Sequence, residues 1–149
     1  MAIIIFDLDD TILPSNSYIT YSDIKVNKKL LSLFEKLSKC NYIYIYTNGT
    51  YSHANTSLKK LNIRKYIDGV FARDMIPYMK PAFESFQYVN NIIRQIHGQD
   101  VSILFLDDMI DNCRVAKLFG WNTFFINPYH NQYKFGYNIG YSNIFDVFN

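Results

Sequence analysis

The stretch that decides the fold is residues 2–11, AIIIFDLDDT, where an apolar run ends abruptly in carboxylates. An uninterrupted apolar run is typical of a strand that is buried on both faces of a sheet. Strand side chains repeat with a period of two, so Asp7 and Asp9 would leave the strand end close together. Two carboxylates at one sheet edge form a catalytic layout. The alternative is a core strand followed by an Asp-rich turn, because Asp and Thr both cap turns and helix starts.

The rest of the chain alternates apolar strands with amphipathic helices. Strands are expected at 42–46, 69–72, 101–106 and 123–126, and helices at about 25–39, 51–61, from Lys80-Pro81 to 98, and after 108 to 119. This alternation predicts an α/β fold, a doubly wound, Rossmann-like parallel sheet with helices on both faces. Ligands of such sheets bind beyond the carboxyl ends of the strands, where Asp7, Thr47 and Asp107 should converge.

Size and composition favour an ordinary globular protein. A chain of 149 residues suits a single domain, 1–149, and 49% hydrophobic with 19% charged residues excludes the disordered class. The net charge of +2 comes without long basic blocks, so there is no strong nucleic-acid signature. One lysine cluster is interpreted as the solvated face of a helix. Its members are Lys25, Lys28, Lys29, Lys36 and Lys39.

Cysteine usage and hydropathy point to a soluble protein of a reducing compartment, the cytoplasm. The two cysteines form no Cys-x-x-Cys pair, and there is no signal peptide and no apolar run of about 18 residues. No membrane partner is therefore expected.

Two irregular regions flank the expected sheet. Residues 12–23 are predicted to form a small flap over the end of the first strand. The tail from 127 to 149 is interpreted as a wrap that packs on the core, with an interface as the less favoured alternative. Its aromatic residues are Tyr129, Tyr133, Phe135, Tyr137, Tyr141, Phe145 and Phe148.

Four stretches resemble, in their order and in their positions at element ends, the four motifs of the haloacid dehalogenase-like (HAD) superfamily. They are Phe6-Asp7-Leu8-Asp9-Asp10-Thr11, Thr47-Asn48, Lys80-Pro81 and Leu106-Asp107-Asp108-Met109-Ile110-Asp111-Asn112. A lone Asp-x-Asp-x-Thr is weak, whereas four motifs in order are specific. The resemblance runs from residue 3 to about 126 and implies an HAD-like core.

The resemblance implies a role for each catalytic residue. Asp7 matches the nucleophile that becomes an aspartyl phosphate, and Asp9 matches the general acid and base. The Thr47 hydroxyl, the Asn48 backbone N–H and the Lys80 ammonium would hold the phosphate oxygens. Taken alone, Thr47 would be interpreted as a turn former and Lys80 as a surface lysine. Their positions relative to the other motifs favour the functional roles instead.

The resemblance also implies a Mg²⁺ site. The Asp7 carboxylate, the Asp9 backbone carbonyl and Asp107 would be the ligands, because hard oxygen donors suit this ion. Asp108 and Thr11 are expected behind these ligands, with Asp108 orienting metal-bound waters.

The remaining polar residues are assigned structural or surface roles. Asp111 and Asn112 are predicted to cap or begin the following helix, where the helix dipole favours them. The three histidines match no motif position and are expected to be structural or exposed. They are His53, His97 and His130.

The presence of Asp9 favours a phosphatase, because P-type ATPases carry Thr there and dehalogenases lack the metal-binding carboxylates. The expected function is a Mg²⁺-dependent phosphomonoester hydrolase that forms an aspartyl phosphate. The fourth motif is similar to the Asp-Asp-Ser-x-x-Asn pattern of pyrimidine 5′-nucleotidases and magnesium-dependent phosphatases, with Met109 in place of Ser. A nucleoside 5′-monophosphate phosphatase is therefore the first choice. Protein phosphatase, nucleic-acid-end phosphatase and a degenerate phosphate-binding module are the alternatives.

The chain is expected to lack a cap domain. Relatives that act on small metabolites insert a cap between the first three motifs, and here the intervals 12–46 and 49–79 are filled by the expected flap, helices and strands. An open site favours a phosphoprotein, a terminal nucleotide or a lid from a partner subunit, which leaves a homodimer open. Specificity would then rest on the flap around Tyr18 and Tyr21.

Overall fold

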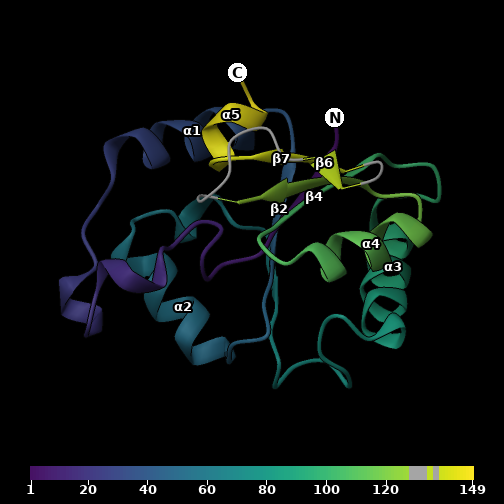
Figure 1. The fold of residues 1–149 in the computed structure, drawn as a ribbon, viewed down its shortest axis with the longest axis horizontal. Helices are drawn as coiled ribbons and strands as arrows, with labels where there is room; N and C mark the ends of the chain where they lie inside the picture. Colours follow the sequence, from purple (N-terminus) through teal and green to yellow (C-terminus); the bar gives the residue numbers. More distant parts are fainter. Residues whose placement is uncertain (128–133, 136–137) are drawn as a thin grey trace.

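The computed structural model describes residues 1–127, 134–135 and 138–149, and it contains a sheet with helices on both faces (Figure 1). The strands are β1 (Ile3–Phe6), β2 (Tyr42–Tyr46), β3 (Gly69–Phe71), β4 (Ile103–Asp107), β5 (Asn122–Ile126), β6 (Lys134–Phe135) and β7 (Asn138–Tyr141). The helices are α1 (Lys28–Ser38), α2 (Tyr51–Lys60), α3 (Phe83–His97), α4 (Ile110–Leu118) and α5 (Ile144–Val147). Three 3₁₀ turns are η1 (Ser15–Ser17), η2 (Tyr21–Asp23) and η3 (Arg64–Tyr66).

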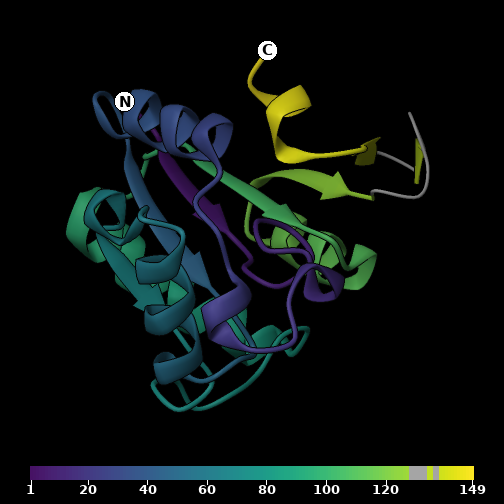
Figure 2. The ribbon, with the colours of Figure 1, turned by 90° about the vertical axis from the view of Figure 1, so that its left-hand side faces the viewer.

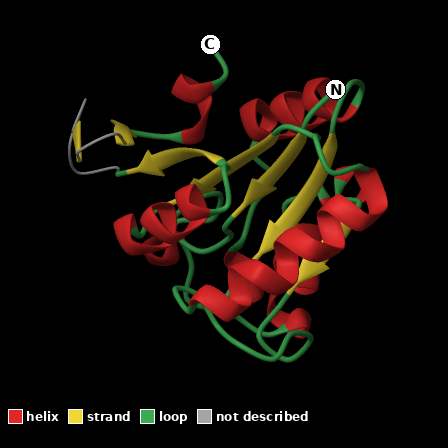
Figure 3. Cartoon of the chain, turned by 90° about the vertical axis from the view of Figure 1, so that its right-hand side faces the viewer, coloured by secondary structure: helices red, strands yellow, loops and turns green. Residues whose placement is uncertain are grey.

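The strand order is β3-β2-β1-β4-β5-β7-β6, and every neighbouring pair is parallel except β7 and β6. Figures 2 and 3 show the strands running side by side with helices packed against the two faces of the sheet. The predicted α/β fold with a parallel sheet is confirmed.

The two faces of the sheet bury separate hydrophobic clusters. Along β1, Ile4 and Phe6 join a cluster with residues of α1, α2 and α5, whereas Ile3 and Ile5 join a cluster with residues of α3 and α4. This alternation follows from the two-residue period of a strand. Both faces are apolar because both are covered.

Strand register places two carboxylates next to each other. Phe6 of β1 pairs with Leu106 of β4, so Asp7 and Asp107 occupy the next position along each strand. By the two-residue period of a strand, both side chains are on the same face of the sheet as Ile5, the face that α3 and α4 cover. The fold itself brings these acids together at the carboxyl edge of the sheet.

Several element boundaries differ from the expected ones. Helix α1 begins at Lys28 rather than Lys25, because the Asn27 side chain accepts hydrogen bonds from the first turn and caps it there. Pro81 does not occupy the first turn of a helix as expected: α3 begins at Phe83, and the Lys80–Pro81 bond is cis.

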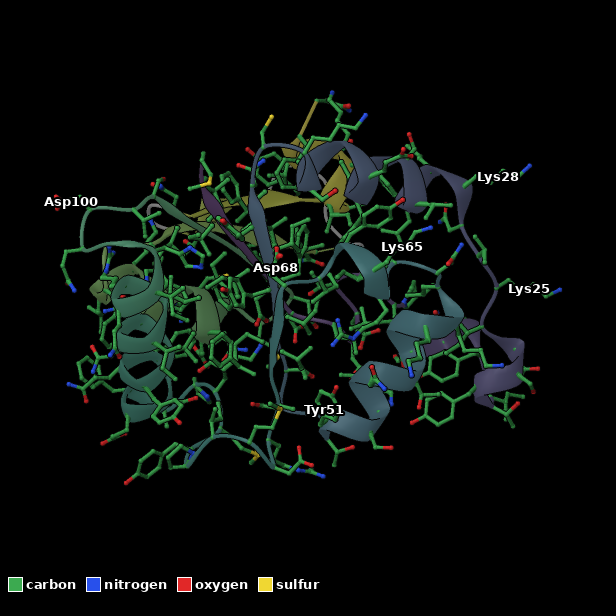
Figure 4. The ribbon with its side chains drawn as sticks, turned by 180° about the vertical axis from the view of Figure 1, so that it is seen from behind. Lys25, Lys28, Tyr51, Lys65, Asp68 and Asp100 are labelled. Carbon is green, nitrogen blue, oxygen red and sulfur yellow. The ribbon has the colours of Figure 1, made fainter. Side chains whose placement is uncertain are left out.

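The lysine cluster is solvated as predicted. Lys25 and Lys28 point outward from the molecule in Figure 4. All five members are exposed: Lys25, Lys28, Lys29, Lys36 and Lys39.

The tail contributes a strand that sequence analysis did not predict. β7 pairs with β5, with Phe125 opposite Gly140, and extends the sheet. Its sequence, NIGY, has no apolar run to signal a strand. Ile144 is buried and Phe148 lies 6.2 Å from the Phe6 ring, so this part of the tail packs on the core as predicted. The prediction for the other aromatics falls outside the described residues and side chains: Tyr129, Tyr133, Phe135 and Tyr137.

The intervals that could hold a cap contain short elements. Between β1 and β2 lie η1, η2 and α1, and between β2 and β3 lie α2 and η3. None of the helices that the structure describes is long and apolar enough to cross a membrane.

Candidate active site

A buried ion cluster lies where β1 and β4 end. Lys80, in the loop before α3, extends its ammonium group between Asp7 and Asp107. Its Nζ donates to Asp7 Oδ1 at 3.1 Å, to Asp107 Oδ2 at 2.7 Å and to the Tyr46 carbonyl oxygen at 2.8 Å. The three ammonium protons therefore have three acceptors, as a buried lysine requires.

Further donors orient each carboxylate. The Thr11 hydroxyl donates to Asp7 Oδ2 at 3.0 Å. The Met109 backbone N–H donates to Asp107 Oδ1 at 2.8 Å, and Asn112 Nδ2 donates to Asp107 Oδ2 at 3.0 Å. Asn112 thus does more than begin a helix, because its buried amide orients a carboxylate of the site.

Asp111 behaves as sequence analysis expected. It lies in the first turn of α4, and its exposed carboxylate pairs with Arg114 at 3.1 Å, one helical turn away. It takes no part in the buried cluster.

Three carboxylates and one ammonium share this small volume. Oxygens of Asp7, Asp107 and Asp108 lie within 4.8 Å of one another. Burial raises the pKa of Asp7 to about 7 and that of Asp107 to about 6, although Lys80 opposes both shifts. Burial also raises the pKa of Asp108. The charge of one lysine does not compensate three ionised acids.

This donor set fits a divalent cation. Its donors are hard carboxylate oxygens, and with all three acids ionised the cluster would carry two uncompensated negative charges. Asp108, which sequence analysis placed behind the ligands, contributes an oxygen to the same cluster. The Asp9 carboxylate is not among the oxygens of this cluster.

Asn48 holds Lys80 in place. Its Nδ2 donates to the Lys80 carbonyl oxygen at 2.9 Å, and the Lys80 N–H donates to its Oδ1 at 2.9 Å. The side-chain amide of Asn48 is thus engaged twice with the backbone of Lys80.

Thr47 is buried at the end of β2, and the Gly49 N–H donates to its Oγ1 at 3.0 Å. The hydroxyl oxygen is thereby engaged as an acceptor.

His53 also lies at this edge, although it matches no sequence motif and was expected to be structural or exposed. Its Nε2 lies 3.0 Å from Asp9 Oδ1 and 3.1 Å from Asp9 Oδ2, and its Nδ1 lies 2.8 Å from the hydroxyl of Tyr21 in η2. Figure 4 shows α2 starting at Tyr51, just beyond the end of β2. The position of His53 in the first turn of this helix was the available signal.

Gly49 lies beside His53, Thr47 and Asp9. A Cβ atom there would be 3.1 Å from His53 Cδ2, 3.3 Å from Thr47 Oγ1 and 3.7 Å from Asp9 Oδ2. The first two distances are shorter than ordinary van der Waals contact. A residue without a side chain lets the three groups converge.

The predicted flap brings aromatic rings to the same edge. The rings of Tyr18 and Tyr21 are stacked with centroids 6.4 Å apart. Burial and, to a lesser extent, the nearby charge of Asp9 raise the pKa of Tyr18. The flap therefore lies beside Asp9.

No family model and no curated protein sequence matches the chain. Solved structures do match. YfnB of Bacillus subtilis, named as a HAD-hydrolase and solved with bound magnesium, has a TM-score of 0.74 at 15% identity over 99% of this chain and 96% of that one. The chain has the HAD-like fold.

Two further structures share the HAD-like fold. The core domain of a Streptococcus pneumoniae protein named as a phosphoglycolate phosphatase has a TM-score of 0.64 at 17% identity, over 98% of this chain and 91% of that one. A Thermotoga maritima protein named as a beta-phosphoglucomutase has a TM-score of 0.65 at 13% identity, over 99% and 98%. These names differ in reaction, so the choice of chemistry depends on the site.

Proposed function

We propose that the chain is a Mg²⁺-dependent phosphomonoester hydrolase of the HAD type, which acts through an aspartyl phosphate on Asp7. The observation that carries this is the buried contact of Asp7 with Lys80 beside two further carboxylates. A phosphatase needs a nucleophile, a proton donor for the leaving oxygen and positive charge opposite the phosphoryl oxygens. Asp7, Asp9 and Lys80 supply one of each.

In the first half of the reaction, a carboxylate oxygen of Asp7 forms a bond to phosphorus while the bond from phosphorus to the leaving oxygen breaks. Asp9, protonated at this stage, gives its proton to that oxygen and becomes a carboxylate. The products are a free alcohol and the aspartyl phosphate. Lys80 and Thr11 keep the Asp7 carboxylate in one orientation during the attack.

In the second half, the Asp9 carboxylate takes a proton from water, and the water oxygen forms a bond to phosphorus. The bond between phosphorus and Asp7 breaks, which releases phosphate and restores both carboxyl groups to their initial states. The Thr47 hydroxyl and the Asn48 N–H would hold phosphoryl oxygens in both halves.

The carboxylates of Asp7, Asp107 and Asp108 would hold Mg²⁺, with the Asp9 carbonyl as the further ligand that the family resemblance implies. When bound, the ion offsets negative charge on the carboxylates and on the phosphoryl group.

We infer that the substrate is a nucleoside 5′-monophosphate. The fourth motif supports this, and so does the stacked pair of Tyr18 and Tyr21 beside Asp9, which offers a surface for a base. A site without a cap domain would also admit a phosphopeptide or a nucleic-acid end. These three substrate classes are distinguished by kcat/KM on uridine 5′-monophosphate, a phosphoserine peptide and a 5′-phosphorylated oligonucleotide. A preference for the peptide or the oligonucleotide would overturn the choice of a nucleoside monophosphate.

The proposed activity is tested with p-nitrophenyl phosphate. We expect hydrolysis with Mg²⁺, its loss on adding EDTA, and a decrease of at least about 10³-fold in Asp7→Asn, because the nucleophile is removed. Asp111→Asn changes an exposed carboxylate of the same edge and serves as the matched control. Wild-type protein that binds phosphate without turnover would indicate a binding module instead.

A further inference from the structure

We propose that His53 is a positioning residue that holds Asp9 for proton transfer, and that Tyr21 locks the imidazole ring in the required orientation. This assignment rests on the proposed function, in which Asp9 is the general acid and base. It adds a side chain from α2 and one from the flap to a site whose buried carboxylates lie where β1 and β4 end.

The first support is geometric. His53 contacts both oxygens of Asp9, at 3.0 and 3.1 Å, and in the described part of the chain no other side chain donates a hydrogen bond to that carboxylate. The Asp9 side chain is 37% exposed, so neighbouring atoms leave it room to turn. Burial and ion pairing hold Asp7, whereas His53 is what holds Asp9.

The ring itself is held from its other side. A neutral imidazole has one N–H donor and one acceptor nitrogen, and the Tyr21 hydroxyl lies 2.8 Å from Nδ1. When this hydroxyl donates to Nδ1, the ring proton is on Nε2 and faces Asp9. In that arrangement the Tyr21 hydroxyl would favour the tautomer that donates to the Asp9 carboxylate.

The backbone of His53 is equally well placed. Its N–H donates to the Thr50 hydroxyl oxygen, 3.2 Å away, which caps α2. Gly49 leaves space for the ring edge, because a Cβ atom there would lie 3.1 Å from His53 Cδ2. The Thr50 cap, the space at Gly49 and the Tyr21 hydroxyl together restrict the position of the ring.

The chain provides a matched control in a second histidine–tyrosine pair. His97, at the end of α3, has its Nε2 2.7 Å from the hydroxyl of Tyr44. Its ring also packs on Tyr42, which begins β2 at the opposite edge of the sheet from Asp9. The same pairing therefore exists without a catalytic carboxylate.

A misplaced general acid has a kinetic signature that a merely unstable protein lacks. The p-nitrophenolate ion leaves without help, whereas phenolate is a poorer leaving group and benefits from a proton. Because kcat/KM reports on steps up to the release of the first product, it should fall more for phenyl phosphate than for p-nitrophenyl phosphate when Asp9 is displaced.

The experiment measures kcat/KM for these two substrates with Mg²⁺ in five proteins: wild type, His53→Ala, His53→Gln, Tyr21→Phe and His97→Ala. In His53→Ala we expect a decrease of roughly 30-fold with phenyl phosphate and less than about threefold with p-nitrophenyl phosphate, because general acid catalysis contributes about 10²- to 10⁴-fold. Glutamine keeps an N–H donor near the position of Nε2 and should restore most of the loss. Tyr21→Phe should also lose more kcat/KM with phenyl phosphate than with p-nitrophenyl phosphate, but by a smaller factor. His97→Ala should match wild type.

Three results would overturn the role of His53. The first is an equal loss of kcat/KM on both substrates, and the second is no selective loss with phenyl phosphate in either His53→Ala or Tyr21→Phe. The third is the same selective loss in His97→Ala. Adding His53→Ala to Asp9→Asn should cause no further decrease, because both changes remove one function. If wild type hydrolyses neither substrate, the proposed function itself fails, and that result is distinct from a failure of the histidine variants alone.

Discussion

Asp7 and Asp9 are two residues apart at the end of one strand, yet they lie in opposite environments. The Asp7 side chain is 11% exposed and contacts a fully buried lysine, whereas the Asp9 side chain is 37% exposed and contacts a histidine that the flap holds. A strand period of two predicts one common direction for both side chains, but Asp7 contacts Lys80 in the loop before α3, whereas Asp9 contacts His53 of α2. Identical side chains thus receive different chemistry from the elements that surround them.

The difference is physically useful. The proposed nucleophile, Asp7, must be held rigidly, and burial beside Lys80 does this. A general acid must exchange its proton with a leaving group and with water, so it has to remain accessible. In many active sites, two carboxyl groups take different roles, such as nucleophile and general acid, because their surroundings differ.

Removing the lysine gives the largest expected effect on the buried side of this comparison. In Lys80→Met, without divalent metal at pH 8, we expect the free energy of unfolding to fall by about 3–5 kcal/mol, because Asp7 and Asp107 lose their buried cation. Urea unfolding followed by circular dichroism measures the change. Lys36→Met on the exposed face of α1 is the control and should be nearly neutral. Equal stability of the two variants would contradict the importance of the buried pair.

The pH dependence of stability sharpens the same comparison. Because the pKa of Asp7 is raised from 3.8 to about 7 on folding, the folded protein binds more protons than the unfolded chain between these values. This contribution to the free energy of unfolding is present below pH 3.8 and is lost as the pH rises to about 7. Asp107, with a pKa raised to about 6, acts in the same direction.

Urea unfolding in EDTA from pH 4 to 8 tests this, with Asp7→Asn as the reference that mimics a protonated Asp7. We expect wild type to lose stability relative to the variant up to about pH 7. Saturating Mg²⁺ should abolish the trend, because carboxylates bound to a dication stay ionised. A difference that stays constant with pH in EDTA would contradict the raised pKa of Asp7.

The smallest expected effect concerns the exposed side. In Gly49→Ala the new methyl group presses on His53 and Thr47, and we expect a decrease of about tenfold in kcat/KM with a loss of less than about 1 kcal/mol in stability. Gly120→Ala is the counterpart: its φ of 78° strains an alanine although nothing lies within 4 Å. That variant should lose about 1 kcal/mol of stability and keep its activity. Loss of stability without loss of activity in Gly49→Ala would show that the contact does not matter to the site.

Most of the sheet could be predicted because its strands are continuous apolar runs. The range of β2 matches the predicted strand, since aromatic and β-branched residues stop at a polar turn. β7 could not be predicted, because a four-residue segment with Asn and Gly becomes a strand only when β5 offers an edge to pair with. The start of α1 was misplaced by three residues because the side chain of Asn27 caps the helix there, after Lys25 and Val26.

By itself, the sequence determined the alternation of strands and helices and placed acids, a threonine and a lysine at element ends, because apolar periodicity and polar interruption are local properties of a chain. The expected sheet also predicted that Asp7, Thr47 and Asp107 converge, but only the tertiary structure decided which side chains contact one another. The contacts of Lys80 with Asp7 and of His53 with Asp9 join residues 73 and 44 positions apart. Such contacts depend on strand register and on how each helix packs, and no local pattern encodes them. For the same reason a histidine that matched no motif became a neighbour of the proposed general acid.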